Sequence, residues 1–376
     1  MADIQGTWDK KFEGVAATLS KSLDGGGDVG ASVAVMVGGD PVVDIWGGFI
    51  DEAKTTPWER DTIVNVWSTT KTMTFLCALM LADRGQLDFH APVADYWPEF
   101  AAAGKEAVEV RHLMAHTAGL PGWTQHLETE DLADWEKCTS LLAAQEPWWE
   151  QGTASGYHAV TQGFLIGEVV RRITGKSIGT WFADEVAGPL GADFHIGLPV
   201  SEDHRVAPVI PPPPVDLEAM SPSDIALRTL RNPVLDATWT YNDWWRRAEI
   251  PAANGQGNAR SVATVQSIIA GGGEARGIRL LSEKGCDTIF EEQADGEDLV
   301  LGIPMRFGMG YGLSSETMPL GPRTCFWGGY GGSLIIMDQD AGITVAYMMN
   351  RMESGLVGDS RGANIVMAAL AGLAGD

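Results

Sequence analysis

The segment VWSTTKTMTFLCALMLADRG, residues 66–85, decides how the chain is interpreted. After Lys71 the residues are mostly apolar up to Arg84, and Gly85 is a residue that ends helices. The pattern predicts a buried helix that begins near Ser68. Since positions three apart share one helix face, the amine of Lys71 can reach the hydroxyl of Ser68.

This pairing has a chemical meaning. A serine hydroxyl attacks poorly until a base takes its proton. The apolar helix behind Lys71 would desolvate the amine and lower its pKa, which favours the neutral, proton-accepting form. At the start of a helix, the Ser68 backbone N–H lacks an acceptor and can hold an oxyanion. The spacing alone also fits a helix-capping serine followed by a solvated lysine.

Strand and helix signals divide the chain. Helices are predicted over 11–24, 106–116, 158–174, 259–270 and 365–373, strands over 31–37, 41–48, 324–327, 333–337 and 343–349, and an extended loop over 206–214. Strands at both ends with helices between them predict one sheet and a mixed α/β (α+β) fold. We expect residues 1–85 and 255–376 to form an α/β subdomain, and residues 86–254 a mainly helical one.

Composition excludes several classes of function. The net charge of −24 argues against nucleic-acid and anionic-membrane partners. The sequence contains no apolar run of the ~20 residues that a membrane span needs, and the first residues do not read as a signal peptide. We therefore expect a cytoplasmic protein whose four cysteines are buried free thiols.

Several segments resemble one known family. Residues 66–72, with the apolar helix after them, resemble the nucleophile motif of the serine β-lactamase and penicillin-binding-protein superfamily. Further segments are similar to its class C β-lactamase branch, in the same order: LMAHTAGL (113–120), Gly156-Tyr157, NARS (258–261) and WGGYGGS (327–333). The resemblance covers about residues 30–350. It implies the β-lactamase/transpeptidase-like fold, an antiparallel sheet flanked by helices with a mainly helical insertion.

The resemblance also implies site residues. Ser68 would be the nucleophile and Lys71 its base. Tyr157 matches the motif tyrosine, which would share a proton with Lys71 and pass it to the leaving group. The backbone N–H groups of Ser68 and Tyr330 would form the oxyanion hole.

Two motifs depart from the β-lactamase pattern. The second motif, Tyr-x-Asn in that branch, is Tyr157-His158-Ala159 here, and the third, Lys-Thr-Gly, is Trp327-Gly328-Gly329. The groups that serve an amide-bearing, negatively charged antibiotic are thus absent. A Trp-x-Gly third motif resembles the family VIII carboxylesterases. It implies cleavage of a small-molecule ester, with no cofactor, through an acyl-Ser68 intermediate.

We expect substrate contacts from Trp327, Gly328 and Gly329. His158 is a further candidate, although neighbours on a helix point about 100° apart. Tryptophans at 148, 149, 239, 244 and 245 could line an acyl pocket. The sequence does not distinguish a monomer from a homo-oligomer.

Other functions stay open. The chain could be an amide hydrolase (a D-amino-acid amidase or peptidase, an oligoamide hydrolase or a weak β-lactamase), an acyltransferase, or an inactive ligand-binding relative. His112 and His116 are four apart on a predicted helix, which is metal-ligand spacing, but they lack the acidic residue of a His-Glu-x-x-His motif. We therefore predict no metal site.

Overall fold

The computed structural model describes residues 2–214, 223–234, 236–316 and 318–375. Its largest element is a nine-stranded sheet in the order β1-β3-β2-β15-β14-β13-β12-β11-β10, and all neighbouring strands are antiparallel. The strands are β1 (Ile4–Trp8), β2 (Gly30–Val37), β3 (Asp40–Gly48), β10 (Ala294–Glu297), β11 (Pro304–Phe307), β12 (Gly312–Leu313), β13 (Thr324–Gly328), β14 (Leu334–Asp338) and β15 (Ile343–Met349).

The two ends of the chain meet in the middle of this sheet. Strand β2 pairs with the whole length of β15, from Ala31 opposite Met349 to Val37 opposite Ile343. The hairpin from β2 to β3 turns at Gly38 and Gly39, whose φ angles are 59° and 85°, as the glycine pair predicts. The prediction of one sheet built from both ends is therefore confirmed.

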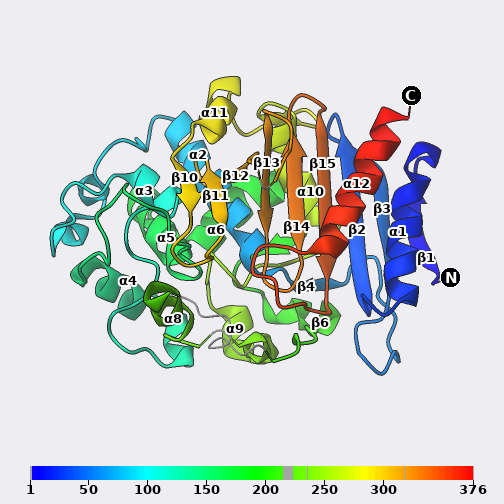
Figure 1. The fold of residues 1–376 in the computed structure, drawn as a ribbon, viewed down its shortest axis with the longest axis horizontal. Helices are drawn as coiled ribbons and strands as arrows, with labels where there is room; N and C mark the ends of the chain where they lie inside the picture. The colour runs from blue at the N-terminus through cyan, green and yellow to red at the C-terminus, as the bar shows by residue number, and fades with distance from the viewer. Residues whose placement is uncertain (1, 215–222, 235, 317, 376) are drawn as a thin grey trace.

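Three long helices cover the sheet (Figure 1). Helices α1 (Glu13–Asp24) and α12 (Ser360–Ala374) pack against each other on one face. Helix α10 (Ala259–Ala270) packs on β2, β14 and β15 from the other face. It has the bounds that the sequence predicts, because Asn258 and Ser261 form a capping box at its start. Helix α12 begins five residues before the predicted 365, where the Asp359 side chain caps it.

The remaining helices gather beside the sheet (Figure 1). Helix α2 (Lys71–Asp83) lies at their centre and packs on α5 (Thr161–Thr174), α6 (Ile178–Phe182) and α11 (Glu283–Asp287). The others are α3 (Val110–Met114), α4 (Trp135–Ala144), α7 (Gly188–Leu190), α8 (Asp224–Leu230) and α9 (Asp243–Arg247). The predicted helix 106–116 is too long at both ends, because α3 stops before His116, whose φ is 61°. The predicted helix 158–174 is too long at its start, since α5 begins only at Thr161.

A second, small sheet has four short strands in the order β5-β7-β4-β6. Its strands are β4 (Ile63–Asn65), β5 (Phe194–His195), β6 (Val206–Ala207) and β7 (Gln256–Gly257), and a separate hairpin joins β8 (Glu274–Ala275) to β9 (Ile278–Arg279). Strand β6 lies inside the predicted loop 206–214, because its backbone pairs with β4. Strands β4 and β7 belong to the predicted α/β subdomain, and β5 and β6 to the predicted helical one. Because one sheet joins strands from both, it does not test where the boundary between the subdomains lies, and the boundaries stay a prediction.

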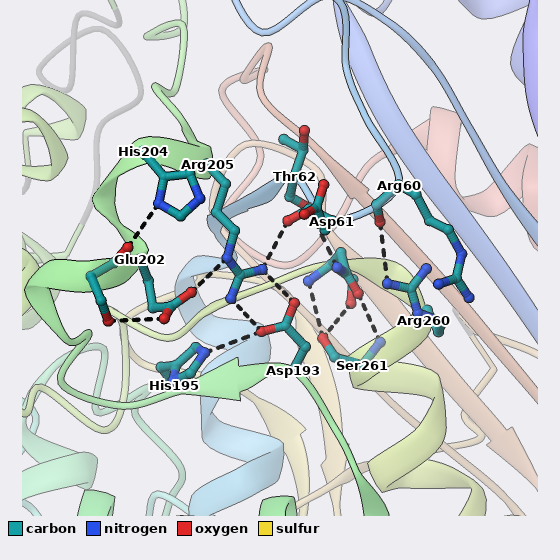
Figure 2. A network of polar contacts seen from close by, with 12 residues as sticks. Arg60, Asp61, Thr62, Asp193, His195, Glu202, His204, Arg205, Arg260 and Ser261 are labelled. Carbon is teal, nitrogen blue, oxygen red and sulfur yellow. Dashed lines mark hydrogen bonds and ion pairs between the residues drawn. The ribbon is translucent and has the colours of Figure 1, made fainter.

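A network of charged side chains fastens the small sheet (Figure 2). The guanidinium of Arg205 donates to both carboxylate oxygens of Asp193 at 2.5 and 2.7 Å, to Glu202 at 2.8 Å and to the Asp61 carbonyl at 2.8 Å. It thereby ties the segments that carry β5 and β6 to the loop before β4. Such two-pronged arginine–carboxylate contacts fix both distance and orientation.

All four cysteines are buried and free, as the sequence predicts. None of the helices in the described ranges combines the length and the apolar character that a membrane crossing requires.

Candidate active site

The segment that carries Ser68 is a tight turn, not the first turn of an α-helix. A 3-10 turn spans Trp67–Thr70, and α2 starts only at Lys71. Since a 3-10 helix has three residues per turn, the side chains of residues three apart eclipse each other. The turn therefore brings Lys71 Nζ to 3.1 Å from Ser68 Oγ.

Other parts of the fold hold this turn in place. Trp67 has a φ of 50°, a conformation that is costly for a bulky side chain and needs support from its surroundings. The Ser333 hydroxyl donates to the Val66 carbonyl at 2.8 Å and lies 2.9 Å from the Thr69 hydroxyl. The Thr70 hydroxyl accepts from the Gly255 amide at 2.9 Å. Both sides of the strained residue are thus fixed.

The amine of Lys71 lies in a fully buried cradle. It donates to the carbonyl oxygens of Ala159 at 2.7 Å and Ala252 at 3.0 Å, and its third neighbour is the Ser68 hydroxyl. No carboxylate in the described ranges forms an ion pair with it. Burial lowers the pKa of Lys71 well below its usual range, which confirms the desolvation that the sequence predicts.

This cradle suits a neutral amine. Carbonyl oxygens can only accept, so the Ala159 and Ala252 contacts use two hydrogens of Nζ. A neutral amine has two hydrogens and one lone pair. The lone pair then points to Ser68, whose hydroxyl can donate to it.

The hydroxyl of Tyr157 approaches Ser68 from the other side, at 2.5 Å from Oγ. Lys71 Nζ lies over the tyrosine ring, 4.8 Å from its centroid. Burial raises the pKa of Tyr157, the hydrogen bond to Ser68 lowers it in part, and the nearby carboxylate of Asp298 raises it again. The phenol therefore keeps its proton and donates to Ser68 Oγ.

Tyr157 lies on a loop, four residues before α5 begins. The carbonyl of His116 accepts from the Gly156 amide at 3.0 Å, and His116 Nδ1 accepts from the His158 amide at 3.0 Å. Burial lowers the pKa of His116 well below its usual range, so the ring is a neutral acceptor. His116 lies outside α3, so the predicted pair of histidines on one helix is wrong. Across the described residues, no group of His, Cys, Asp or Glu is arranged to bind a metal.

The structure does not support the substrate contact that the sequence analysis expects from His158. The side chain is fully buried. Its Nε2 accepts from the Leu120 amide at 3.1 Å, and its Nδ1 lies 2.6 Å from the Gly156 carbonyl. Burial lowers the pKa of His158 to about 3. The imidazole thus joins two loops and has neither exposed surface nor a free nitrogen for a substrate.

Trp327 also lies elsewhere than expected. Its buried ring stacks on His116, with centroids 5.5 Å apart, and lies behind Tyr157 at 6.0 Å. The indole N–H lies near the phenol oxygen without reaching hydrogen-bond geometry. Trp327 therefore supports the tyrosine from behind and does not form a wall of the cleft.

The two glycines after Trp327 allow close backbone approach. A Cβ on Gly329 would lie 2.5 Å from the Val66 carbonyl oxygen, and a Cβ on Gly328 would lie 2.5 Å from the Gly358 amide. The Cβ positions of both glycines therefore face protein atoms, and neither glycine is part of the cleft lining described below, so substrate contacts from them stay a prediction.

The close approach at Gly329 also bears on the expected oxyanion hole. A Cβ on Gly329 would lie 3.3 Å from the Ser68 amide nitrogen, so the backbone that leads to Tyr330 runs next to the nucleophile turn. Among the described residues, the amides of Ser68 and Tyr330 donate no hydrogen bond to another protein group. The two predicted donors are available.

A narrow cleft opens over Ser68, with about 320 Å³ of empty space including its open mouth. Among the residues that the structure describes, none that lines it carries a charge, and this lining consists of Trp67, Ser68, Tyr157, Ala159, Val160, Leu230, Ala253, Tyr330 and Leu356. Trp67 and Tyr330 form its aromatic wall, with ring centroids 5.4 Å apart.

The five tryptophans of the inserted region do not line this cleft. The ring of Trp245 packs behind Trp67, with centroids 5.6 Å apart. The sequence analysis missed the wall-forming role of Trp67, although it is adjacent to Ser68. It also missed Leu230 and Leu356, which lie far from every motif.

One known protein family matches most of the chain. A protein-family model described as Beta-lactamase matches residues 15–369. The esterase/β-lactamase LipL of Mycobacterium tuberculosis (strain ATCC 25618 / H37Rv) is 36% identical over 370 residues, which cover 94% of this chain and 84% of LipL.

Solved structures match over nearly the whole chain. The crystal structure of a family VIII carboxylesterase is 42% identical and has a TM-score of 0.94, with 98% of this chain and 100% of that chain covered. A penicillin-binding-protein homologue from Caulobacter crescentus is 35% identical with a TM-score of 0.89, over 98% of this chain and 100% of its own.

Proposed function

The chain belongs to the β-lactamase family and is a serine hydrolase, and from that premise we propose that it is a carboxylesterase for small, uncharged esters. The predicted superfamily and the β-lactamase/transpeptidase-like fold are confirmed. The choice of ester, the acyl-Ser68 intermediate and the roles of the site residues are the proposal. A cytoplasmic location and the absence of nucleic-acid and membrane partners belong to it as well.

One observation carries the proposal. Ser68 Oγ lies within hydrogen-bond distance of a buried amine without a carboxylate partner and of a protonated phenol. It does so at the base of a cleft whose described lining holds no charged side chain. Such a site provides a base, an acid and an apolar surface for the substrate.

The acylation step can be derived from these contacts. The Lys71 lone pair takes the Ser68 proton while Oγ forms a bond to the ester carbonyl carbon. The carbonyl electrons move to oxygen, where the amides of Ser68 and Tyr330 stabilise the charge. The carbon–oxygen bond to the alcohol then breaks, and the leaving oxygen takes the proton of Tyr157. The Lys71 ammonium returns a proton to the phenolate beside it.

Deacylation repeats this sequence with water. Lys71 accepts a proton from the water molecule that attacks the acyl carbon. The tetrahedral intermediate uses the same two amides, and Ser68 Oγ leaves as it regains a proton from Tyr157. The Lys71 ammonium then returns its proton to the Tyr157 phenolate, so both groups end in their starting forms and no further reactant is needed.

The chain differs from β-lactamases where a charged antibiotic would bind. Ala159 has no side-chain amide, and its carbonyl is used by Lys71. Trp327 stands in place of the motif lysine and is buried behind Tyr157. The cleft therefore offers no cation to a carboxylate, which favours neutral esters.

β-Lactam hydrolysis is a second candidate, favoured by the name of the relative LipL, an esterase/β-lactamase. The carboxylesterase proposal is tested by parallel assays with p-nitrophenyl butyrate and nitrocefin. We expect turnover of the ester, little or none of nitrocefin, and covalent labelling of Ser68 by a fluorophosphonate. A faster reaction with nitrocefin, or labelling at another residue, would contradict it.

A further inference from the structure

A buried carboxylate contacts the backbone of Tyr157. Asp298 directly follows β10, and its side chain is fully buried. Its Oδ1 accepts from three backbone amides, those of Tyr157 at 2.9 Å, Val300 at 3.0 Å and Leu301 at 2.9 Å. Its Oδ2 is buried and, among the described residues, has no hydrogen-bond partner.

Turn capping accounts for only part of this arrangement. An aspartate that accepts from the amides two and three residues later stabilises its own turn, and asparagine does the same. Capping explains neither the contact to Tyr157 nor the second oxygen. A buried polar atom without a partner costs free energy, and such atoms in native proteins often mark functional sites.

The turn grips the tyrosine segment at two neighbouring points. The amide of Leu299 donates to the Ser155 carbonyl at 2.9 Å, next to the Asp298 contact with Tyr157. The Asp298 amide donates to the Ile303 carbonyl at 3.0 Å, which closes the turn just before β11. Because α5 begins only at Thr161, these contacts replace a helix as the support of Tyr157.

Among the described residues, Asp298 carries the carboxylate that acts on the phenol through its charge. Lys71 on α2, His116 after α3 and His158 next to the tyrosine all have pKa values that burial lowers, and they are neutral in the resting site proposed above. On β13, Trp327 presents only an uncharged N–H. A negative charge nearby disfavours ionisation of the phenol, which raises its pKa.

We propose that Asp298 is a positioning residue for Tyr157, whose carboxylate fixes the tyrosine backbone and whose charge keeps the proton on the tyrosine hydroxyl. The consequence is a division of labour in which Tyr157 enters the reaction as the acid and Lys71 as the base. This inference rests on the proposed function of Ser68, Lys71 and Tyr157.

Two substitutions separate the backbone contact from the charge. Asp298→Asn keeps an oxygen that accepts from the three amides but removes the charge, whereas Asp298→Ala removes both. Asp51→Asn is the matched control, because Asp51 also accepts from backbone amides, those of Thr55 and Thr56, but lies at an exposed turn. Folding of each variant is checked by circular dichroism.

We expect the alkaline limb of the kcat/KM profile to move to lower pH by about one unit in Asp298→Asn. Asp298→Ala should in addition lose about 100-fold in kcat, since the tyrosine is displaced. Asp51→Asn should match the wild type. A folded Asp298→Asn enzyme with an unchanged profile would overturn the inference.

A second readout does not depend on turnover. Tyrosinate absorbance near 295 nm is followed against pH with and without Tyr157→Phe, and the difference reports Tyr157 alone. We expect this difference to titrate at lower pH in Asp298→Asn than in the wild type. Equal titration would refute the role of Asp298 even if the ester assay failed, whereas a shift without ester turnover would leave only the proposed function in error.

Discussion

Two polar clusters in this molecule handle charge in opposite ways. In the cleft, Lys71 is fully buried and contacts only neutral groups, and burial lowers its pKa. In the network around the small sheet, Arg205 contacts two carboxylates and is partly exposed (Figure 2). There, burial raises the pKa of Asp193, but hydrogen bonds from His195 and Arg205 outweigh it and hold that pKa well below its usual range.

The difference separates chemistry from structure. A cation paired with carboxylates stays charged and holds segments together, but it cannot accept a proton. A lysine buried without such a partner lowers the stability of the fold and gains a usable lone pair. Substitutions in the two clusters should therefore affect different properties, activity in the cleft and stability in the network.

The largest effect is expected at the nucleophile. Ser68→Ala removes the atom that forms the acyl bond, so turnover of p-nitrophenyl butyrate and fluorophosphonate labelling should both fall to background. The melting temperature should stay near that of the wild type. Substantial residual turnover would mean that another residue is the nucleophile.

Removal of the base comes next. Lys71→Met keeps an apolar chain of similar length without the amine, and kcat should fall by at least about 100-fold because no group takes the serine proton. Lys137→Met is the matched control, since Lys137 lies in an exposed ion pair with Asp131. Near-normal turnover by Lys71→Met would refute the role of this amine.

Lys71→Met should also differ from the wild type in how the free energy of unfolding depends on pH. In the unfolded chain Lys71 is protonated below pH ~10.4, whereas in the folded protein its lowered pKa leaves it neutral over part of that range. Unfolding then takes up one proton, and the free energy of unfolding rises with pH by about 1.4 kcal/mol per unit. Denaturant titrations at pH 7 to 10 should show this extra slope in the wild type and not in Lys71→Met. Equal slopes would mean that Lys71 is charged when folded.

The network should give the smallest effect. Arg205→Met removes the contacts to Asp193 and Glu202 and should lower the free energy of unfolding by about 1 to 2 kcal/mol, given the partial exposure of the carboxylates. Since the pKa of Asp193 is lowered, this stability is fully present above the ordinary carboxyl pKa and is lost progressively as the pH falls through the lowered pKa of the folded state. Denaturant titrations should therefore show a smaller difference in stability between variant and wild type at pH 3 than at pH 7, and kcat at pH 7 should be unchanged. If Arg205→Met lost activity but not stability, the assignment of the network to stability and of the cleft to activity would be contradicted.

Much of this could be predicted from the sequence. Apolar strand patterns and capping residues placed the sheet and α10 correctly, because they are local signals. The pairing of Ser68 with Lys71 followed from a spacing of three, although the turn proved tighter than an α-helix. Motif order identified the family, because such segments keep their places in the chain.

The errors have a common physical origin. Strand β13 is buried on both faces, so the alternation of side chains did not reveal that Trp327 points to the back of Tyr157. The loop that holds Tyr157 is fixed by His116 and Asp298, which lie 42 and 141 residues away from the amides they contact. No local pattern announces contacts of this kind.

The central claim is that Lys71 is neutral in the folded enzyme, and lysine NMR tests it most directly. Lysine labelled with ¹³C at Cε reports each amine by its chemical shift, and Lys71→Met identifies the signal of interest. Lys105, whose pKa burial lowers to about 8, serves as an internal comparison. We predict that Lys71, like Lys105, titrates well below the exposed lysines. A Lys71 signal that titrates with the exposed lysines near pH 10.4 would contradict the account.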